Sequence, residues 1–282
     1  MPVQEIENLS DDVLTALAHV RAACATGDGQ DPLDEAAVLE IKHRGLAGAR
    51  LWMYGDSGFA LLHEGGVDLA VAPAVRSSGF GAALADAAAP EATSAWSHGD
   101  HPAAAALALK HGFDRDRELW VMRRPTSLEL PQSSTPQGIR GFRPGDEPEL
   151  LRVNAAAFVD HPEQGAMDEE NLRERMAEDW FDPAGLLVAM DGDVMLGFHW
   201  TKVHGPTTGE VYVVATAPEA QGKGLGKALT LAGLRHLAGE LSEEGAEVIL
   251  YVESDNLPAL AVYEGLGFTH ADEDTHVQYA RR

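Results

Sequence analysis

Cysteine and positive charge are scarce in this chain of 282 residues. Cys24 is the only cysteine, so an internal disulfide and a cysteine-rich zinc site are both excluded. Because Cys24 lies in an apolar helical pattern, we interpret it as a small core residue rather than a catalytic thiol. Lys and Arg number 21 against 45 Asp and Glu, a net charge of −24. Such an acidic chain is a poor candidate for binding nucleic acid and should attract cationic small molecules.

Long apolar runs, export signals and several catalytic motifs are also lacking. No apolar run approaches the roughly 18 residues that a membrane-spanning helix needs. The start of the chain carries Glu5 and Glu7 and no basic segment, so no signal peptide is expected. H-E-x-x-H and G-x-S-x-G do not occur, and the histidines lack metal-ligand spacing. We therefore expect a cytoplasmic protein, as a working assumption a monomer, with no metal and no membrane or nucleic-acid partner.

The most informative stretch runs from Gly209 to Lys227 and reads GEVYVVATAPEAQGKGLGK. Its β-branched and aromatic start predicts a strand, which Pro218 should end because proline cannot donate to a ladder. A glycine-rich turn and a good helix former follow. Glycines let the backbone approach a ligand, and the first N–H groups of a helix have no partners of their own. This order of elements suits an anion, most often a phosphate.

Two common phosphate motifs do not fit this turn, since neither the dinucleotide fingerprint nor the P-loop is complete. The pattern Q-x-x-G-x-G is met by Gln221, Gly224 and Gly226, and it resembles the pyrophosphate arm of acetyl-CoA-dependent GNAT N-acetyltransferases. The alternative is that these glycines merely turn the chain into a helix. Downstream, a strand ending in Asn256, a helix with Tyr263 and a closing L-G-F match the second half of the same family pattern.

The turn occurs twice in the chain. The stretch from Ala72 to Leu84 repeats it, with Arg76 in the place of Gln221, and the segment PTSLELPQSSTP between the copies reads as a linker. The sequence thus predicts two tandem GNAT domains of the α/β (α+β) class, each a mixed central sheet flanked by helices. The predicted bounds are 1–124 for the first domain, 125–137 for the linker and 138–282 for the second.

The first copy lacks the side chains that the chemistry needs. Aligned on the turn, Gly65 stands opposite Glu210, and aligned on the closing Gly-Phe pairs, Ala108 stands opposite Tyr263 and His101 opposite Asn256. No lysine stands at the positions of the two lysines in the second turn, and a serine, Ser77, replaces the glycine at 222. We expect the first domain to be catalytically inactive while keeping much of the cofactor turn.

Acetyl transfer from a thioester to an amine needs a base for the amine, polarisation of the carbonyl, a proton for the thiolate and alignment of the reactants. Glu210 is the candidate base, and Tyr263 the candidate acid. The alternatives are a solvent-facing edge-strand glutamate and a core tyrosine packed on Phe268. The residues expected to bind acetyl-CoA in the second domain are Val214, Ala215, Thr216, Gln221, Gly222, Lys223, Gly224, Leu225, Gly226, Lys227, Asn256, Leu257, Pro258, Ala259, Leu260 and Ala261. Those expected in the first are Leu69, Ala70, Val71, Arg76, Gly79 and Gly81.

Further stretches narrow the resemblance. FVDHPEQG, GFHWTKVH, GEVYV and LYVESDN, together with the tandem copies, resemble the mycothiol synthase family. The resemblance implies that acetyl-CoA acetylates the cysteine amine of cysteinyl-glucosaminyl-inositol, with Glu210 as base and Tyr263 as acid. It implies substrate contacts at Glu163, Lys202, Glu210 and Tyr251, and at an N-terminal acid for which Glu35 is the nearest candidate. The alternatives are a GNAT enzyme for another small amine and a silent acyl-CoA-binding sensor.

Overall fold

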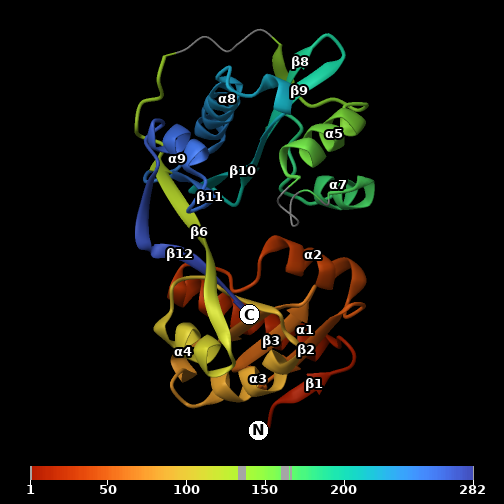
Figure 1. Ribbon diagram of the computed structural model, residues 1–282, viewed down its shortest axis with the longest axis vertical. Helices are drawn as coiled ribbons and strands as arrows, with labels where there is room; N and C mark the ends of the chain where they lie inside the picture. Colours follow the sequence, from red (N-terminus) through yellow and green to blue (C-terminus); the bar gives the residue numbers. More distant parts are fainter. Residues whose placement is uncertain (1, 133–137, 160–164, 166, 282) are drawn as a thin grey trace. The chain divides into compact units, whose positions relative to one another are not determined.

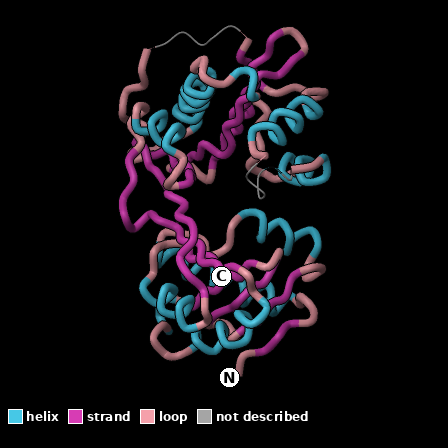
Figure 2. Tube along the Cα trace, in the orientation of Figure 1, coloured by secondary structure: helices cyan, strands magenta, loops and turns pink. Residues whose placement is uncertain are grey.

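The computed structural model describes residues 2–132, 138–159, 165 and 167–281. Their contacts form two compact units, unit 1 with residues 1–120 and 271–282, and unit 2 with residues 121–270. Figure 1 follows the elements from red to blue, and Figure 2 separates helices from strands. In the described residues no helix is both long and apolar enough to cross a membrane.

Unit 1 is an α/β layer structure. Its strands are β1 (Gln4–Ile6), β2 (Ala49–Met53), β3 (Gly58–His63), β4 (Gly66–Val71), β5 (Ser94–Ser97) and the later part of β12 (Thr269–Arg281). Its helices are α1 (Asp11–Asp28), α2 (Glu35–Arg44), α3 (Phe80–Ala88) and α4 (Pro102–Lys110), with 3-10 turns η1 (Pro73–Val75) and η2 (Ala89–Glu91). The helix caps follow the local sequence, since Ser10 and Asp34 each accept a hydrogen bond from the first turn of the helix that follows.

The sheet of unit 1 has the strand order β1-β2-β3-β4-β5-β12, with β4 and β5 parallel and the other pairs antiparallel. Both faces are buried, because Phe59 and Leu61 pack with α1 and α2 while Ala60 and Leu62 pack with α3. Cys24 lies in the first of these cores with 2 % exposure, as expected for a small core residue.

Unit 2 repeats the arrangement. Its strands are β7 (Ile139–Gly141), β8 (Leu186–Asp191), β9 (Val194–Val203), β10 (Thr208–Thr216), β11 (Glu247–Glu253) and the end of β6 (Phe113–Pro125). Its helices are α5 (Glu147–Ala157), α7 (Glu169–Met176), α8 (Leu225–Glu240) and α9 (Leu257–Glu264), with the 3-10 turn η3 (Pro218–Ala220). The strand order is β6-β11-β10-β9-β8-β7, and β10 and β11 run parallel.

The strand β10 contains a β-bulge that β4 lacks. Its register with β9 shifts between Val211 and Val213, so that Tyr212 is an extra residue, whereas β3 and β4 pair without interruption. Pairing of β10 with β11 ends at Val211, and pairing of β4 with β5 ends at Asp68. In both units the pairing of the two parallel strands therefore stops before either strand ends.

The last strand of each sheet comes from the other half of the sequence. Residues 271–282 belong to unit 1, where Val277 and Tyr279 are buried, and Val121 and Met122 belong to unit 2 and are buried there. The units thus have bounds other than the predicted 1–124 and 138–282. The segment predicted as a linker begins as structured backbone, because Arg124 donates hydrogen bonds to the carbonyls of Pro125, Leu128, Glu129 and Leu266.

Candidate active site

Glu210 points away from helix α8. Gly209 precedes it, and a Cβ on Gly209 would lie 2.9 Å from a methyl carbon of Leu237 on α8. Because side chains alternate along a strand, Glu210 lies on the opposite face of the sheet. It is buried, with 7 % exposure. The alternative of an edge-strand glutamate facing solvent is wrong, since β10 has a neighbouring strand on both sides.

Two of the predicted substrate residues share this face with Glu210. Lys202 on β9 stands directly opposite Glu210, and Ile249 on β11 is its partner on the other side. Tyr251 is two residues beyond Ile249, so it also lies on the face of Glu210, and it is 39 % exposed. Three adjacent strands thus place an ammonium, a carboxylate and a phenol on one face of the sheet.

The Lys202 ammonium lies against aromatic rings. Its Nζ is 4.5 Å from the ring centre of Trp180 and 5.3 Å from that of Tyr212. The Tyr212 hydroxyl in turn meets Nη1 of Arg175 at 2.5 Å. The faces of the aromatic rings attract an ammonium at these distances. Sequence reasoning missed Arg175, Trp180 and Tyr212, because their meeting depends on α7 and on the bulge in β10.

Glu210 also has a histidine neighbour that the sequence analysis did not select. Nε2 of His204 lies 2.6 Å from Oε2 of Glu210. His204 follows the end of β9, two residues beyond Lys202, and its backbone N–H donates to the carbonyl of Thr208 across the hairpin. Strand alternation from Lys202 could have identified it.

The glycine-rich turn of unit 2 has the predicted strand–turn–helix form. Gly222 has φ +72° and Gly224 has φ +78°, a left-handed conformation that favours glycine. Gly224 is the N-cap of α8 and no side chain caps the helix there, so the first N–H groups of α8 have no intrahelical partners. Lys223 and Lys227 are exposed beside them, which makes this helix start suitable for a polyanion.

Helix α9 carries the predicted acid. Asn256 is its N-cap and accepts a hydrogen bond from the N–H of Ala259, so this asparagine has a structural role in addition to any ligand contact. Tyr263 is half-buried and packs on Phe268, with ring centres 5.9 Å apart. Burial raises the pKa of Tyr263 to about 12, since the phenolate would lose its hydration. The phenol therefore stays protonated at neutral pH, as a proton donor must.

The first turn has the same backbone form as the second. Ser77 has φ +61° and Gly79 has φ +86°, matching Gly222 and Gly224. The side chain of Arg76 donates to the carbonyl of Val71, as Gln221 donates to that of Thr216 in unit 2. The Arg76 guanidinium also binds both carboxylate oxygens of Asp28, at 2.7 and 2.5 Å. Its charge is therefore balanced within the unit.

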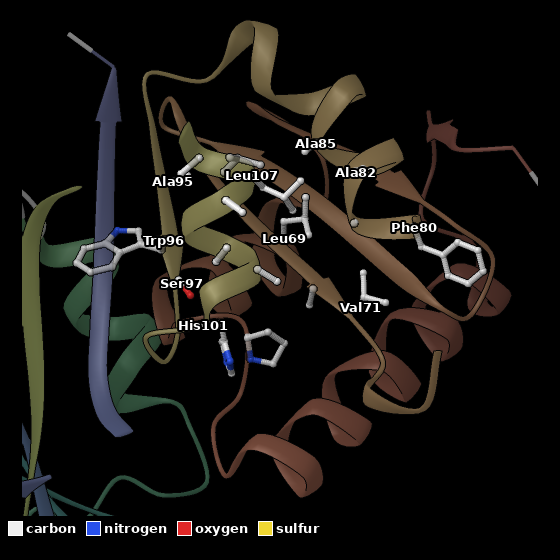
Figure 3. Close-up of a pocket in the computed structure, with 18 of the residues that line it drawn as sticks. Leu69, Val71, Phe80, Ala82, Ala85, Ala95, Trp96, Ser97, His101 and Leu107 are labelled. Atoms are coloured by element: carbon white, nitrogen blue, oxygen red, sulfur yellow. The ribbon is translucent and has the colours of Figure 1, made fainter. Parts of the chain in front are cut away.

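A cavity of about 610 Å³ lies beside this turn in unit 1. Figure 3 shows side chains from β4, β5, α3 and α4 around it, among them Leu69, Ala82 and Leu107, together with His101, which precedes α4. Its size is within the range of ligand pockets, and its wall is mostly apolar. All six residues predicted to bind the cofactor in the first domain line this cavity, namely Leu69, Ala70, Val71, Arg76, Gly79 and Gly81.

The structure corrects the alignment of the two copies by one residue. Gly58 on β3 and Gly197 on β9 mark the same point, because a Cβ on either would lie 2.7 or 2.6 Å from a carbonyl oxygen of the next strand. His63 follows Gly58 by as many residues as Lys202 follows Gly197, so these two side chains are equivalent. His63 pairs with Gly66 on β4, and Lys202 pairs with Glu210 on β10. The bulge therefore makes Gly66, not Gly65, the counterpart of Glu210. A glycine stands there in either alignment, so unit 1 has no carboxylate at this position.

One predicted substrate residue belongs to the other unit, and another cannot be placed on this face or off it. Glu35 is the first residue of α2 and belongs to unit 1. Glu163 lies outside the residues that the structure describes. In the described ranges no group of three or more His, Cys, Asp or Glu side chains could hold a metal ion.

Comparison with known proteins identifies the family of the chain. Residues 151–268 match the acetyltransferase (GNAT) family. The chain is 55 % identical over 294 residues to a mycothiol acetyltransferase of Nocardioides sp., covering 96 % of this chain and 98 % of the relative. It is 44 % identical over 298 residues to the mycothiol acetyltransferase of Saccharopolyspora erythraea, covering 90 % and 97 %.

Solved structures support the tandem fold. A tandem GNAT protein from the clavulanic acid biosynthesis pathway superposes with a TM-score of 0.68 at 18 % identity, covering 98 % of this chain and 97 % of that one. A GCN5-related N-acetyltransferase from Sphaerobacter thermophilus gives 0.67 at 22 % identity, covering 98 % and 94 %. The predicted fold class is confirmed, and the chain belongs to the mycothiol acetyltransferase family of GNAT N-acetyltransferases.

Proposed function

We propose that this protein transfers the acetyl group of acetyl-CoA to the cysteine amine of cysteinyl-glucosaminyl-inositol, the last step of mycothiol biosynthesis. The similarity to mycothiol acetyltransferases over nearly the whole chain supports this activity. The observation that carries it in the structure is the buried carboxylate of Glu210 on a bulged strand that leads directly into the glycine turn. A small cationic acceptor also suits a chain of net charge −24.

In the proposed mechanism Glu210 accepts a proton from the substrate ammonium, and the free amine attacks the thioester carbonyl. Backbone N–H groups of Val214 to Thr216, beyond the bulge, hold the carbonyl and the pantetheine arm. The C–N bond forms, the C–S bond breaks, and Tyr263 supplies the proton that the thiolate takes up, while the second proton lost by the nitrogen restores the phenol. Lys202 and Tyr251 bind hydroxyl groups of the sugar and the inositol.

For the cofactor residues of unit 2 we propose the roles that the family resemblance implies. N–H groups at the start of α8, together with Lys223 and Lys227, bind the pyrophosphate. Residues 256–261 line the opposite wall of the cofactor cleft. These assignments, with Glu35 and Glu163 as acceptor contacts, are proposals, and so are a cytoplasmic location and a monomeric state.

The cavity of unit 1 is proposed to bind a second acetyl-CoA without turning it over. Gly66 and Ala108 stand where unit 2 has Glu210 and Tyr263, so this unit lacks both proton-transfer groups. Its turn also lacks the two lysines, and its arginine is paired with Asp28. We therefore expect weaker binding here than in unit 2.

The proposed activity is tested by incubating the protein with acetyl-CoA and cysteinyl-glucosaminyl-inositol and measuring the acetylated product by mass spectrometry. Free cysteine and glucosamine serve as control acceptors. Acetylation of the precursor alone is expected. Product from another amine instead would indicate a different GNAT acceptor. Binding of acetyl-CoA with no product from any of these amines would favour the sensor interpretation.

The base is tested by Glu210→Gln, which keeps the shape of the side chain. We expect unchanged affinity for acetyl-CoA and turnover lower by roughly a hundredfold or more, the usual contribution of a positioned base. The loss should be largest at low pH, where little free amine exists without help. Unchanged turnover would remove Glu210 as the base.

A further inference from the structure

We infer that His204 passes to solvent the proton that Glu210 gains in each turnover. The inference rests on the proposed function, in which Glu210 is the base. It assigns a role to a side chain that sequence reasoning did not select and that lies at hydrogen-bond distance from the buried carboxylate.

The stoichiometry of the reaction requires such a path. An ammonium and a thioester become an amide and a thiol, so the nitrogen loses two protons and the sulfur gains one. One proton is therefore left over in every turnover and must reach water before the next. Glu210 is only 7 % exposed, so its carboxylate has little direct contact with the solvent that must take this proton.

The geometry of the pair supplies the path. Nε2 of His204 and Oε2 of Glu210 are 2.6 Å apart, and two lone pairs at that distance need a proton between them. The resting pair thus holds one proton, and Oε1 is the oxygen assigned to the substrate ammonium. The side chain of His204 is 37 % exposed, against 9 % for Glu210. When Oε1 takes up the substrate proton, the shared proton moves fully to Nε2, and the N–H on the exposed edge of the imidazole gives its proton to water. One proton thus enters the pair and one leaves it.

The other charged groups around the pair are engaged elsewhere. Lys202, opposite Glu210, has its ammonium against Trp180 and Tyr212. Glu247 on β11, opposite Thr208, is paired with Arg123 at 2.6 Å. Among the described charged and titratable side chains, His204 is therefore the one that hydrogen-bonds the carboxylate of Glu210. An imidazole suits proton exchange at neutral pH because its usual pKa lies close to it.

Two variants separate a proton path from a merely structural hydrogen bond. His204→Gln keeps an N–H donor for Oε2 but cannot carry a proton, and His204→Ala removes the side chain. We expect both to lower kcat by about tenfold or more, with the KM for acetyl-CoA unchanged. Imidazole added to the buffer should restore the alanine variant, because the site is open to solvent, and should not restore the glutamine variant, in which the space is filled.

The controls decide between the possible failures. His236→Gln changes another histidine of unit 2 that pairs with a carboxylate, Asp182 at 3.1 Å, and should leave kcat unchanged. Wild-type turnover in His204→Gln, or no effect of imidazole on His204→Ala, overturns the proton path. Wild-type turnover in Glu210→Gln instead overturns the base itself. Absence of product from the unmodified enzyme contradicts the proposed function, so the three failures are distinguishable.

Discussion

Each unit has a buried carboxylate in contact with histidine, Glu210 in unit 2 and Asp68 in unit 1, and the two contacts differ. In unit 2, Glu210 meets one half-exposed imidazole. In unit 1, Asp68 is 3 % exposed and contacts two, His63 at 3.0 Å and His98 at 3.2 Å. Burial alone would raise the pKa of Asp68, but the hydrogen bonds from both imidazoles lower it overall. Asp68 is therefore an internal counter-ion of unit 1, whereas Glu210 is in contact with a group that exchanges protons with water.

Replacing Asp68 by Asn should destabilise unit 1 in a pH-dependent way. The pKa values of His63 and His98 are raised, so their pairing stabilises the fold below about pH 6.5 and is lost as pH rises through the raised values. The contribution of Asp68, whose pKa is lowered, is lost only in acid. We expect Asp68→Asn to cost about 1–3 kcal/mol near pH 6 and less at pH 8, measured by calorimetry. Asp86→Asn, on the exposed pair with Lys110, should have little effect; an equal loss there would contradict the argument.

Tyr263→Phe tests the proton donor. The ring contact with Phe268 is kept, so stability should change little, while turnover should fall by roughly a hundredfold. Because the pKa of Tyr263 is about 12, its protonated form persists up to that pH, and the wild-type rate should show no alkaline loss from this group below it. Turnover is measured from pH 6 to pH 10. Tyr54→Phe, in unit 1, is the matched control, and wild-type turnover in Tyr263→Phe would exclude the phenol.

At the level of the element, the bulge in β10 and the charge of the glycine turn distinguish unit 2 from unit 1. The extra residue in β10 offsets the strand, and pairing with β11 stops at the same place. The glycine turn that follows has left-handed φ values at the same two positions as its counterpart in unit 1, where a serine occupies the first of them. The two turns thus differ in charge rather than in backbone form.

The charge difference predicts the effect of removing both lysines from the second turn. Lys223→Ala with Lys227→Ala should raise the KM for acetyl-CoA by about tenfold, which corresponds to ~1.4 kcal/mol. The dependence of KM on salt should weaken at the same time, since fewer charges are screened. KM is the chosen readout because it reports the unit that turns over. Lys110→Ala is the control, and an unchanged KM in the double variant would mean that the backbone N–H groups are sufficient.

At the scale of the whole molecule, each unit contains a core strand from the other half of the sequence. Val277 and Tyr279 pack in the core of unit 1, and β12 pairs with β5 there. Val121 and Met122, from β6, are buried in unit 2. Cutting the chain at the linker therefore removes a core strand from each half.

Truncation tests this composition. A chain that ends at His270 should lose the buried side chains of β12 from unit 1, and hydrogen exchange of the β5 backbone should become fast. A chain that ends at Ala280 keeps them and serves as the control. A fragment of residues 121–270 should unfold cooperatively, whereas 138–282 should not, because it lacks Val121 and Met122. Equal stability of the two fragments would contradict these unit bounds.

The sequence by itself determined where strands, turns and helices form, that the arrangement occurs twice, and which family the chain resembles. Pro218 ends a strand, glycines occupy left-handed positions, and Ser10 and Asp34 cap helices, all effects of neighbouring residues. Glu210 and Tyr263 fall on the predicted strand and helix.

Only the tertiary structure decided the features that depend on residues distant in the chain. The exchange of the last strands, the bulge that shifts the alignment to Gly66, and the cavity of unit 1 follow from strand pairing and helix packing. The contact of His204 with Glu210 needs both the hairpin and the register of β9 on β10. Strand register is set by long-range packing, and a shift of one residue moves every side chain to the other face.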